Sequence, residues 1–187
     1  MFEPAARGKG RLMSSQPASD AARVLLDGFS RVREGVEGVL DGIDERHLNW
    51  RADPEANTIA WLVWHLSRVE DDHLADAFDV PQLWGSEGWE DRFGLPLHPR
   101  ATGYGMDAAD VAKVSAPSDL LLGYHQAVAE RTSSLVAGVG AQDLERVVDE
   151  RWDPPVTLGV RLVSVISDSL QHVGQAAYVR GMAERAG

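Results

Sequence analysis

The sequence predicts an all-α protein, a four-helix bundle with a long crossover loop between the second and third helices. Four segments carry apolar residues at intervals of three and four, the spacing of one face of an amphipathic helix. Residues 81–115, which are rich in Gly and Pro, separate the second segment from the third. A connection of that length fits a bundle that includes a crossover. No segment shows a strand pattern longer than a loop fragment.

The first predicted helix spans about residues 20–43, with Asp20 as its N-cap. Its apolar stripe comprises Val24, Leu25, Phe29, Val32, Val36, Val39, Leu40 and Ile43. The second predicted helix is capped by Asn57 or Thr58 and runs over about residues 58–79, before a proline ends it. Its apolar side includes Ile59, Leu62, Val63, Leu66 and Val69.

The third predicted helix spans about residues 118–139, and Ser118 is its expected N-cap. Thr157 opens a fourth helix that extends to about Arg185. Within the crossover, residues 106–114 are expected to form a short turn of helix. The buried sides comprise Leu121, Leu122, Tyr124, Val128, Leu135 and Val136 on the third helix, and Leu162, Val165, Ile166, Leu170, Val173, Ala177 and Val179 on the fourth.

A chain of 187 residues is long enough to bury a substantial core within one domain. Residues 20–187 are expected to form the bundle domain, whereas residues 1–19 lack apolar periodicity and are expected to be a disordered N-terminal tail. No apolar run approaches the roughly 20 residues that a membrane span requires. The N-terminus also lacks the apolar segment of a secretory signal. We therefore expect a cytoplasmic protein with no membrane partner.

Charge and composition exclude several classes of function. The formal net charge of -11 argues against a nucleic-acid partner, because affinity for phosphates comes from Lys and Arg. The chain contains no cysteine, which excludes disulfides, Cys-type zinc sites and thiol nucleophiles within it. Any thiol chemistry must therefore use an external thiol.

Two of the six histidines occupy unusual positions. His65 lies among apolar residues of the second helix, and His172 lies among apolar residues of the fourth. Asp168 precedes His172 by four residues, so both side chains project from one face of the helix. Bundle proteins build metal sites from a carboxylate and a histidine one turn apart, joined by ligands from a facing helix. This pattern predicts a divalent metal site formed by His65, Asp168 and His172.

These residues also have non-functional interpretations. A lone histidine on an apolar face is usually a core residue that bonds to a carbonyl or hydroxyl oxygen. Asp168 and His172 are also consistent with a simple hydrogen-bonded pair, or with a solvent-facing Asp168. His125 is a reserve ligand in place of His65, and Gln175, one turn after His172, is a candidate hydrogen-bond donor to the ligand set.

The remaining polar and aromatic residues are interpreted as structural. Glu70-Asp71-Asp72 is expected to be a solvated helix face, and His73 and His98 are expected to be surface or packing residues. The tryptophans, which include Trp61, Trp64, Trp84, Trp89 and Trp152, are expected to be core or loop anchors more often than pocket residues. The sequence alone identifies no catalytic residue.

Two strings of residues carry a family resemblance. Residues 61–70 are WLVWHLSRVE, and residues 168–175 are DSLQHVGQ. They resemble the motifs of the DinB-like superfamily of bacterial four-helix-bundle metalloproteins, in particular the branch similar to the N-terminal domain of mycothiol-dependent maleylpyruvate isomerase. The resemblance covers residues 20–181.

The resemblance implies a divalent metal, most often zinc or nickel, held by one histidine of the second helix and two ligands of the fourth. Those positions correspond to His65, Asp168 and His172. Many members of the superfamily have histidine where this chain has Asp168, whereas the similar branch has an acidic residue, usually the longer Glu. Relatives with assigned activities are thiol S-transferases or isomerases that use mycothiol, bacillithiol or glutathione.

The leading hypothesis is therefore a metal-dependent transferase or isomerase that uses a mycothiol-like thiol on a small electrophile, in detoxification. Two histidines and one carboxylate also match the facial triad of non-haem iron oxygenases, so iron is the lesser alternative. A non-catalytic stress-related or ligand-binding bundle, with a structural or degenerate metal site, is the alternative from another class. The sequence also leaves open a homodimer through an exposed helix face.

Overall fold

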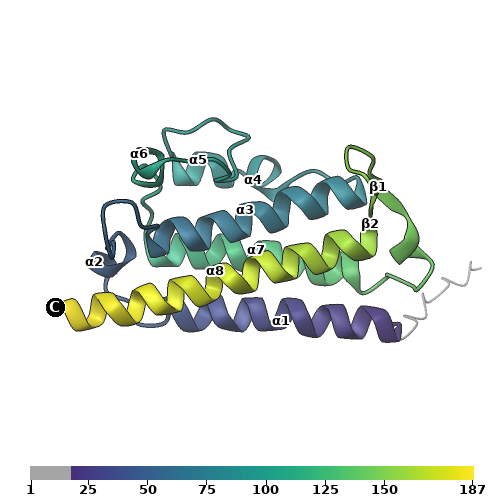
Figure 1. Cartoon of the computed structure of the whole chain (residues 1–187), viewed down its shortest axis with the longest axis horizontal. Coiled ribbons are helices and arrows are strands. Elements are labelled where there is room, and N and C mark those ends of the chain that lie inside the picture. Colours follow the sequence, from purple (N-terminus) through teal and green to yellow (C-terminus); the bar gives the residue numbers. More distant parts are fainter. Residues whose placement is uncertain (1–17) are drawn as a thin grey trace, which may run out of the picture.

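The computed structural model describes residues 18–187 and confirms the predicted all-α bundle (Figure 1). Within these residues four long helices form the bundle: α1 (Asp20–Leu40), α3 (Ile59–Phe78), α7 (Ser118–Val136) and α8 (Leu158–Ala186). The predicted tail, residues 1–19, lies outside the described residues except for its last two. No helix of the described part is long and apolar enough to cross a membrane.

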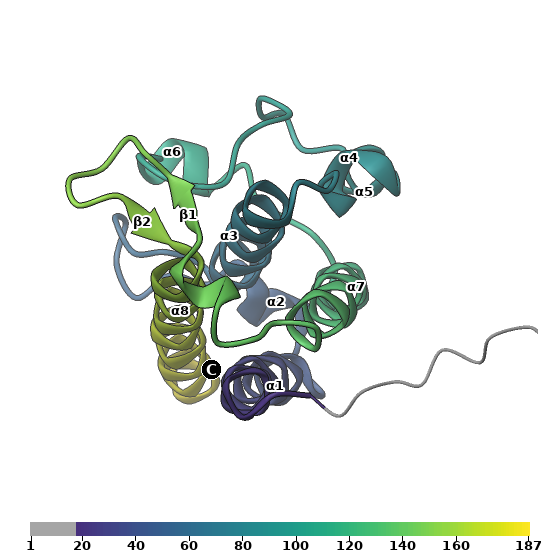
Figure 2. The ribbon, with the colours of Figure 1, turned by 90° about the vertical axis from the view of Figure 1, so that its right-hand side faces the viewer.

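The four helices surround one core in the order α1, α7, α3, α8 (Figure 2). Figure 1 shows that α3 and α7 run in one direction, whereas α1 and α8 run in the other. Because the neighbours α3 and α7 are parallel, the chain between them must return along the whole length of the bundle. This is the predicted crossover, and it explains why that connection is long.

Short elements complete the fold. After α1 comes α2 (Glu45–Leu48), and the crossover contains α4 (Leu83–Ser86), α5 (Trp89–Phe93) and α6 (Ala108–Val111). The connection to α8 contains a 3₁₀ turn, η1 (Asp143–Glu145), and two short strands, β1 (Val147–Asp149) and β2 (Val156–Thr157). The strands pair antiparallel, with Val147 opposite Thr157 and an irregular register beyond that pair.

The helix starts are partly as predicted. The hydroxyl oxygens of Thr58 and Thr157 accept hydrogen bonds from backbone amides in the first turns of α3 and α8. The predicted cap Asp20 was wrong, because Ser19 occupies that position and its hydroxyl accepts from the amide of Ala22. The predicted cap Ser118 was also wrong, because it is the first residue of α7. Its amide and hydroxyl instead donate to the carboxylate of Glu45 in α2.

Aromatic residues of the crossover pack over α3 and α7. The rings of Trp84, Phe93 and Trp89 each lie within 6 Å of the Tyr124 ring, and all of them are buried. The prediction that tryptophans serve as anchors is thus confirmed for most of them, whereas Trp152 is 66% exposed. Val24, which the periodicity assigned to the buried stripe of α1, is 73% exposed, because it lies at the edge of that stripe.

The predicted solvated face at Glu70-Asp71-Asp72 was wrong, because Glu70 and Asp71 are buried. Asp71 accepts hydrogen bonds from the amides that begin α4, at 2.8 Å, and from the hydroxyl of Tyr124, at 2.9 Å. The fully buried Arg68 lies 3.6 Å from Asp71 and donates to Tyr124 and to the carbonyl of Ala101. This Arg68–Asp71 network fastens the start and the middle of the crossover to the bundle.

Glu70 is expected to make stability depend on pH. Its side chain is fully buried, one oxygen accepts from Thr132 at 2.6 Å, and the other has no partner. Burial raises the pKa of Glu70 from 4.5 to about 7. The folded state therefore binds the proton more tightly than the unfolded state, so stability is highest below pH 4.5 and falls as pH rises to 7. The shift corresponds to roughly 3 kcal/mol of unfolding free energy.

The measurement is urea unfolding of the parent and of Glu70→Gln, with a chelator present, at pH 5 and pH 8. Glu70→Gln should lose about 2–3 kcal/mol of the parent's difference between the two pH values. Glu130→Gln, which alters an exposed carboxylate on α7, should keep the parent's difference. The same pH difference in the parent and Glu70→Gln would contradict the assignment.

Candidate metal centre

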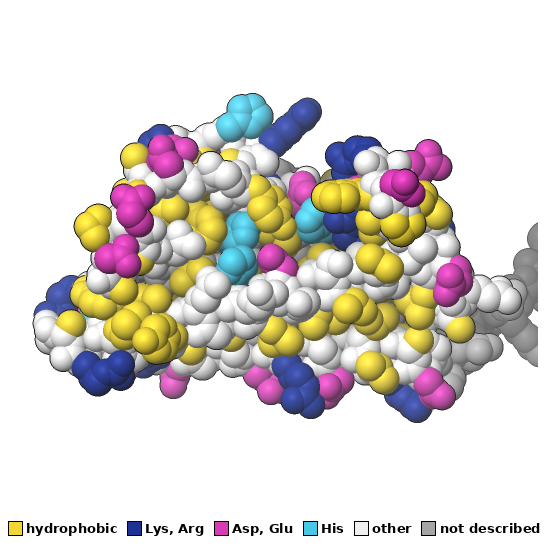
Figure 3. Space-filling view, in the orientation of Figure 1, with side chains coloured by type: hydrophobic (Ala, Val, Ile, Leu, Met, Phe, Trp, Pro, Cys, Tyr) yellow, Lys and Arg dark blue, Asp and Glu magenta, His cyan; other side chains and the backbone are white. Residues whose placement is uncertain are grey.

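His65, Asp168 and His172 meet between α3 and α8, as the sequence predicts. One ligand atom from each residue lies within 4.8 Å of the other two. The two helices are antiparallel neighbours, so a histidine in the first half of α3 faces the middle of α8. Figure 3 shows histidine and acidic side chains gathered in a hollow between these helices.

The imidazole of His65 is oriented by the backbone of the crossover. Its Nδ1 atom is hydrogen-bonded to the carbonyl oxygen of Thr102, which can only accept. Nδ1 therefore carries the proton, and Nε2 keeps a free lone pair. Trp61 stacks on one face of the ring, with 4.6 Å between centroids and 11° between planes. Burial lowers the pKa of His65, which favours the neutral form that binds metals.

Gly103 is required where the crossover touches His65. Its φ is +109°, in the region that side chains avoid. A Cβ atom there would also lie 2.4 Å from Nδ1 of His65 and 3.1 Å from the ring of Trp61. Only glycine lets the backbone come close enough for the Thr102 carbonyl to hold the imidazole.

His172 is oriented in the same way by its own helix. Its Nδ1 lies 3.0 Å from the amide oxygen of Gln175, so Nδ1 donates and Nε2 is again free. Gln175 does contact the candidate ligand His172, but it accepts the hydrogen bond, whereas the sequence had suggested a donor. The imidazoles of His65 and His172 lie 4.7 Å apart between centroids.

Asp168 supplies the observation that fits a metal ion. Its Oδ2 atom is buried and has no hydrogen-bond partner, and its Oδ1 lies 3.7 Å from Nε2 of His172, too far for a hydrogen bond. A simple Asp-His pair therefore does not explain this carboxylate. A buried anionic oxygen without a partner is costly unless a cation neutralises it. Two donors each about 2.1 Å from one ion are at most about 4.2 Å apart, so a small contraction closes the set.

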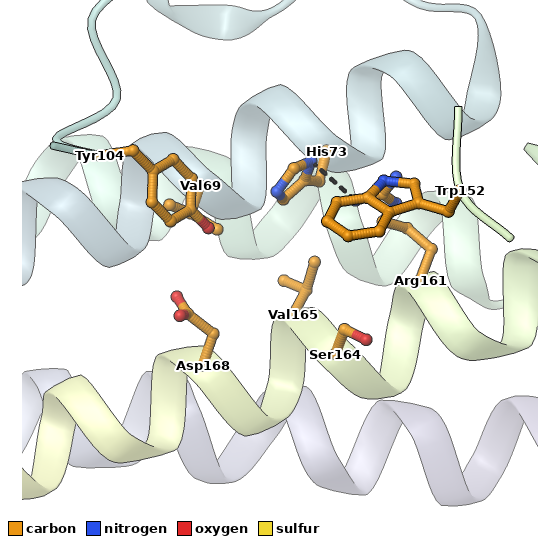
Figure 4. Close-up of a pocket in the computed structure, with 8 residues that line it drawn as sticks. All are labelled: Val69, His73, Tyr104, Trp152, Arg161, Ser164, Val165 and Asp168. Atoms are coloured by element: carbon orange, nitrogen blue, oxygen red, sulfur yellow. Dashed lines mark hydrogen bonds between the residues drawn. The ribbon is translucent and has the colours of Figure 1, made fainter. Parts of the chain in front are cut away.

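A cavity of about 370 Å³ opens beside Asp168 (Figure 4). Val69 of α3 and Val165 of α8 form its apolar sides, and Tyr104 of the crossover lies near the Asp168 end. At the other end the lining residues are His73, Arg161, Ser164 and Trp152. The volume is within the range of small-molecule sites.

His73, His98 and His125 are surface or packing residues, as predicted, and none of them belongs to the candidate ligand cluster. His125, the reserve ligand, is fully buried at the α3–α7 contact, lies 3.1 Å from the hydroxyl of Ser67 and is outside the ligand cluster of the described residues. Burial lowers its pKa to about 4. His98 is exposed. His73 lies in the cavity wall, and its spacing of eight residues from His65 was the sequence signal for that position.

Comparison with known proteins identifies the family. A family model described as Mycothiol-S-transferase matches residues 24–184. The chain belongs to the mycothiol-S-transferase family. This family is part of the DinB-like superfamily, so the predicted resemblance is confirmed.

A solved structure has the same fold as this mycothiol-S-transferase family member. It is described as the crystal structure of the conserved protein of locus from Enterococcus faecalis. Its sequence is 31% identical to this chain, and the two structures superpose with a TM-score of 0.81. The match covers 87% of this chain and 96% of that chain. No curated protein matches. The similarity spans nearly all of both chains, so the bundle is the fold of the whole relative.

Proposed function

We propose that the protein is a divalent-metal-dependent S-transferase that joins mycothiol to a small electrophile. The observation that carries the proposal is the unpartnered Asp168 oxygen, which lies close to two oriented imidazoles and beside a cavity that Asp168 lines. The family description supports the thiol and the transfer reaction. Zinc or nickel is the proposed ion, held by His65, Asp168 and His172.

When bound, a divalent cation lowers the pKa of a coordinated thiol and so favours its nucleophilic thiolate form. The chain provides three donors, which leaves room for external ligands on the cavity side. Thr102 and Gln175 fix the two imidazoles, so their Nε2 lone pairs need no reorganisation. The chain has no cysteine, so the attacking sulfur belongs to the cosubstrate.

The cavity separates the two halves of the reaction. The thiol sulfur is bound at the Asp168 end, and the electrophile lies along the apolar sides formed by Val69 and Val165. Trp61, stacked on His65, excludes water from the far side of the ligand set. This arrangement holds the sulfur and the reacting carbon in contact, which lowers the entropic cost of their encounter.

Elemental analysis of the untagged protein tests the proposal first. We expect about one zinc or nickel ion per chain. We also expect the protein to form a mycothiol conjugate, and this activity should stop when a chelator removes the ion and resume when the ion is added back. Iron with oxygen-dependent turnover would favour the oxygenase alternative. Protein that takes up no metal after dialysis against these ions would instead leave the three residues as core polar groups of a non-catalytic bundle.

A further inference from the structure

His73 is a polar residue of the cavity wall that the proposed metal centre does not use. It lies on the same face of α3 as His65 and Val69, since the three are spaced by four residues. Eight residues of α-helix place it about 12 Å along the axis from His65. A molecule that fills the cavity thus touches Asp168 of the proposed metal centre at one end and His73 toward the other.

The hydrogen bonds of His73 define which nitrogen carries its proton. Its Nδ1 lies 3.3 Å from Nη1 of Arg161, and a guanidinium can only donate. Nδ1 therefore accepts, and Nε2 is the protonated nitrogen. Arg161 is itself fixed, because its Nη2 donates to the buried carboxylate of Asp149 at 2.9 Å. Asp149 stands on β1, so the strand connection orients the imidazole through Arg161.

The alternative of a charged His73 is disfavoured by burial and by Arg161, which together outweigh the opposing effect of the Asp72, Asp168 and Asp76 carboxylates on the pKa of His73. The carboxylate of Asp72 lies 3.8 Å from Nδ1, which is too long for a hydrogen bond. Burial lowers the pKa of His73, and the positive charge of Arg161 acts in the same direction. The imidazole is therefore neutral, with its Nε2–H group available. Figure 4 shows this second nitrogen directed away from Arg161, toward the interior of the cavity.

We propose that His73 is a catalytic hydrogen-bond donor whose Nε2–H binds the carbonyl oxygen of an α,β-unsaturated carbonyl substrate; this rests on the S-transferase function proposed above. The separation of His73 from the metal ligands selects that class of substrate. The carbon attacked by sulfur must lie near Asp168, while the oxygen that accepts the charge lies several bonds away. In a conjugated carbonyl the oxygen lies three bonds from the attacked carbon, so the thiol sulfur, the enone and the hydrogen bond to Nε2 together link the Asp168 end of the cavity to His73. The carbon skeleton suits the apolar sides of the cavity.

The step balances without an oxidant or reductant. The thiol proton passes to solvent, and the sulfur of the thiolate forms a bond to the β carbon. The electrons of the carbon–carbon double bond shift through the carbonyl group to its oxygen, where the Nε2–H of His73 stabilises the negative charge. Water then protonates the α carbon, and the net reaction is addition of the thiol. A neutral imidazole also serves as electrophile in triosephosphate isomerase.

Two substitutions at His73 test the role with mycothiol as the thiol. His73→Leu removes the donor, whereas the amide of His73→Gln can place an N–H near the position of Nε2. The readout is the ratio of kcat/KM for a small enone to that for an alkyl iodide, which has no oxygen to stabilise. We expect His73→Leu to lower this ratio about 100-fold, mainly through kcat, and His73→Gln to recover most of the loss.

Metal content and circular dichroism of both variants should equal those of the parent, since His73 is outside the ligand set. Nitrogen-15 NMR of the parent should show Nε2 protonated and Nδ1 unprotonated, independently of activity. An unchanged ratio in His73→Leu, equal loss with both electrophiles, or protonation at Nδ1 would each overturn the role of His73. A metal-loaded parent that conjugates neither electrophile would overturn the S-transferase proposal itself, and is thereby distinguished from failure at His73.

Discussion

Replacing Asp168 with alanine is expected to weaken binding of zinc or nickel by more than about 100-fold, because partners outside the ligand set alone contribute about 10–100-fold. His172→Ala should have the same effect. The metal-free Asp168→Ala protein should nevertheless unfold at the same or a higher urea concentration than the metal-free parent. The substitution removes a buried oxygen that has no partner in the folded state.

Metal titration and urea unfolding, both performed on chelator-treated protein, measure the two effects. Gln171→Ala is the matched control, because it changes an exposed residue beside His172 that bonds only within its own helix. Asp168→Glu, which restores a carboxylate with a longer side chain, should recover binding. Loss of stability with no change in metal affinity would show that Asp168 is a structural residue.

The second large effect is expected at Asp71, where alanine should cost about 3–5 kcal/mol of unfolding free energy. The buried guanidinium of Arg68 would lose its carboxylate neighbour, and the two amides at the start of α4 would lose their acceptor. Because Arg68 also holds the carbonyl of Ala101, next to Thr102, metal affinity should fall as well. The site is thus coupled to the anchoring of the crossover.

Urea unfolding with and without metal measures this prediction. Asp76→Ala removes an exposed carboxylate from the same helix and should change stability by less than about 0.5 kcal/mol. If Asp71→Ala changed the free energy of unfolding as little as this control does, the Arg68–Asp71 network would not fasten the crossover in solution.

The fold was predictable because helical periodicity recurs in four segments, and the long connection then required a crossover. The predictions that were wrong concern the exposure of individual side chains, which tertiary contacts determine. Val24 fits the apolar period of α1 but lines an open surface pocket with Gly159 and Val163 of α8, so it stays exposed. Asp71 appears in an acidic run that suggests solvent, yet Arg68 and the amides of α4 compensate for its burial.

The candidate ligands were predictable because two of them share one face of one helix, and family motifs indicated the third. The groups that orient them were not. The carbonyl of Thr102 lies 37 residues from His65 in sequence, and Arg161 lies 88 residues from His73. Such pairs depend on how the crossover and the strand connection pack, which no local pattern records. The one sequence feature linked to the contact between the crossover and His65 is the glycine required at position 103.

The separation of α3 from α8 along the chain also determines when the metal can bind during synthesis. Ribosomes add about 5–20 residues each second, so α8 emerges many seconds after α3. Until then His65 has no partner ligands, and an ion cannot guide the assembly of α1, α3 and α7. Those helices and the crossover must rely on their apolar contacts and on the Arg68–Asp71 network. Loading of the proposed metal site would therefore follow the assembly of the first three helices.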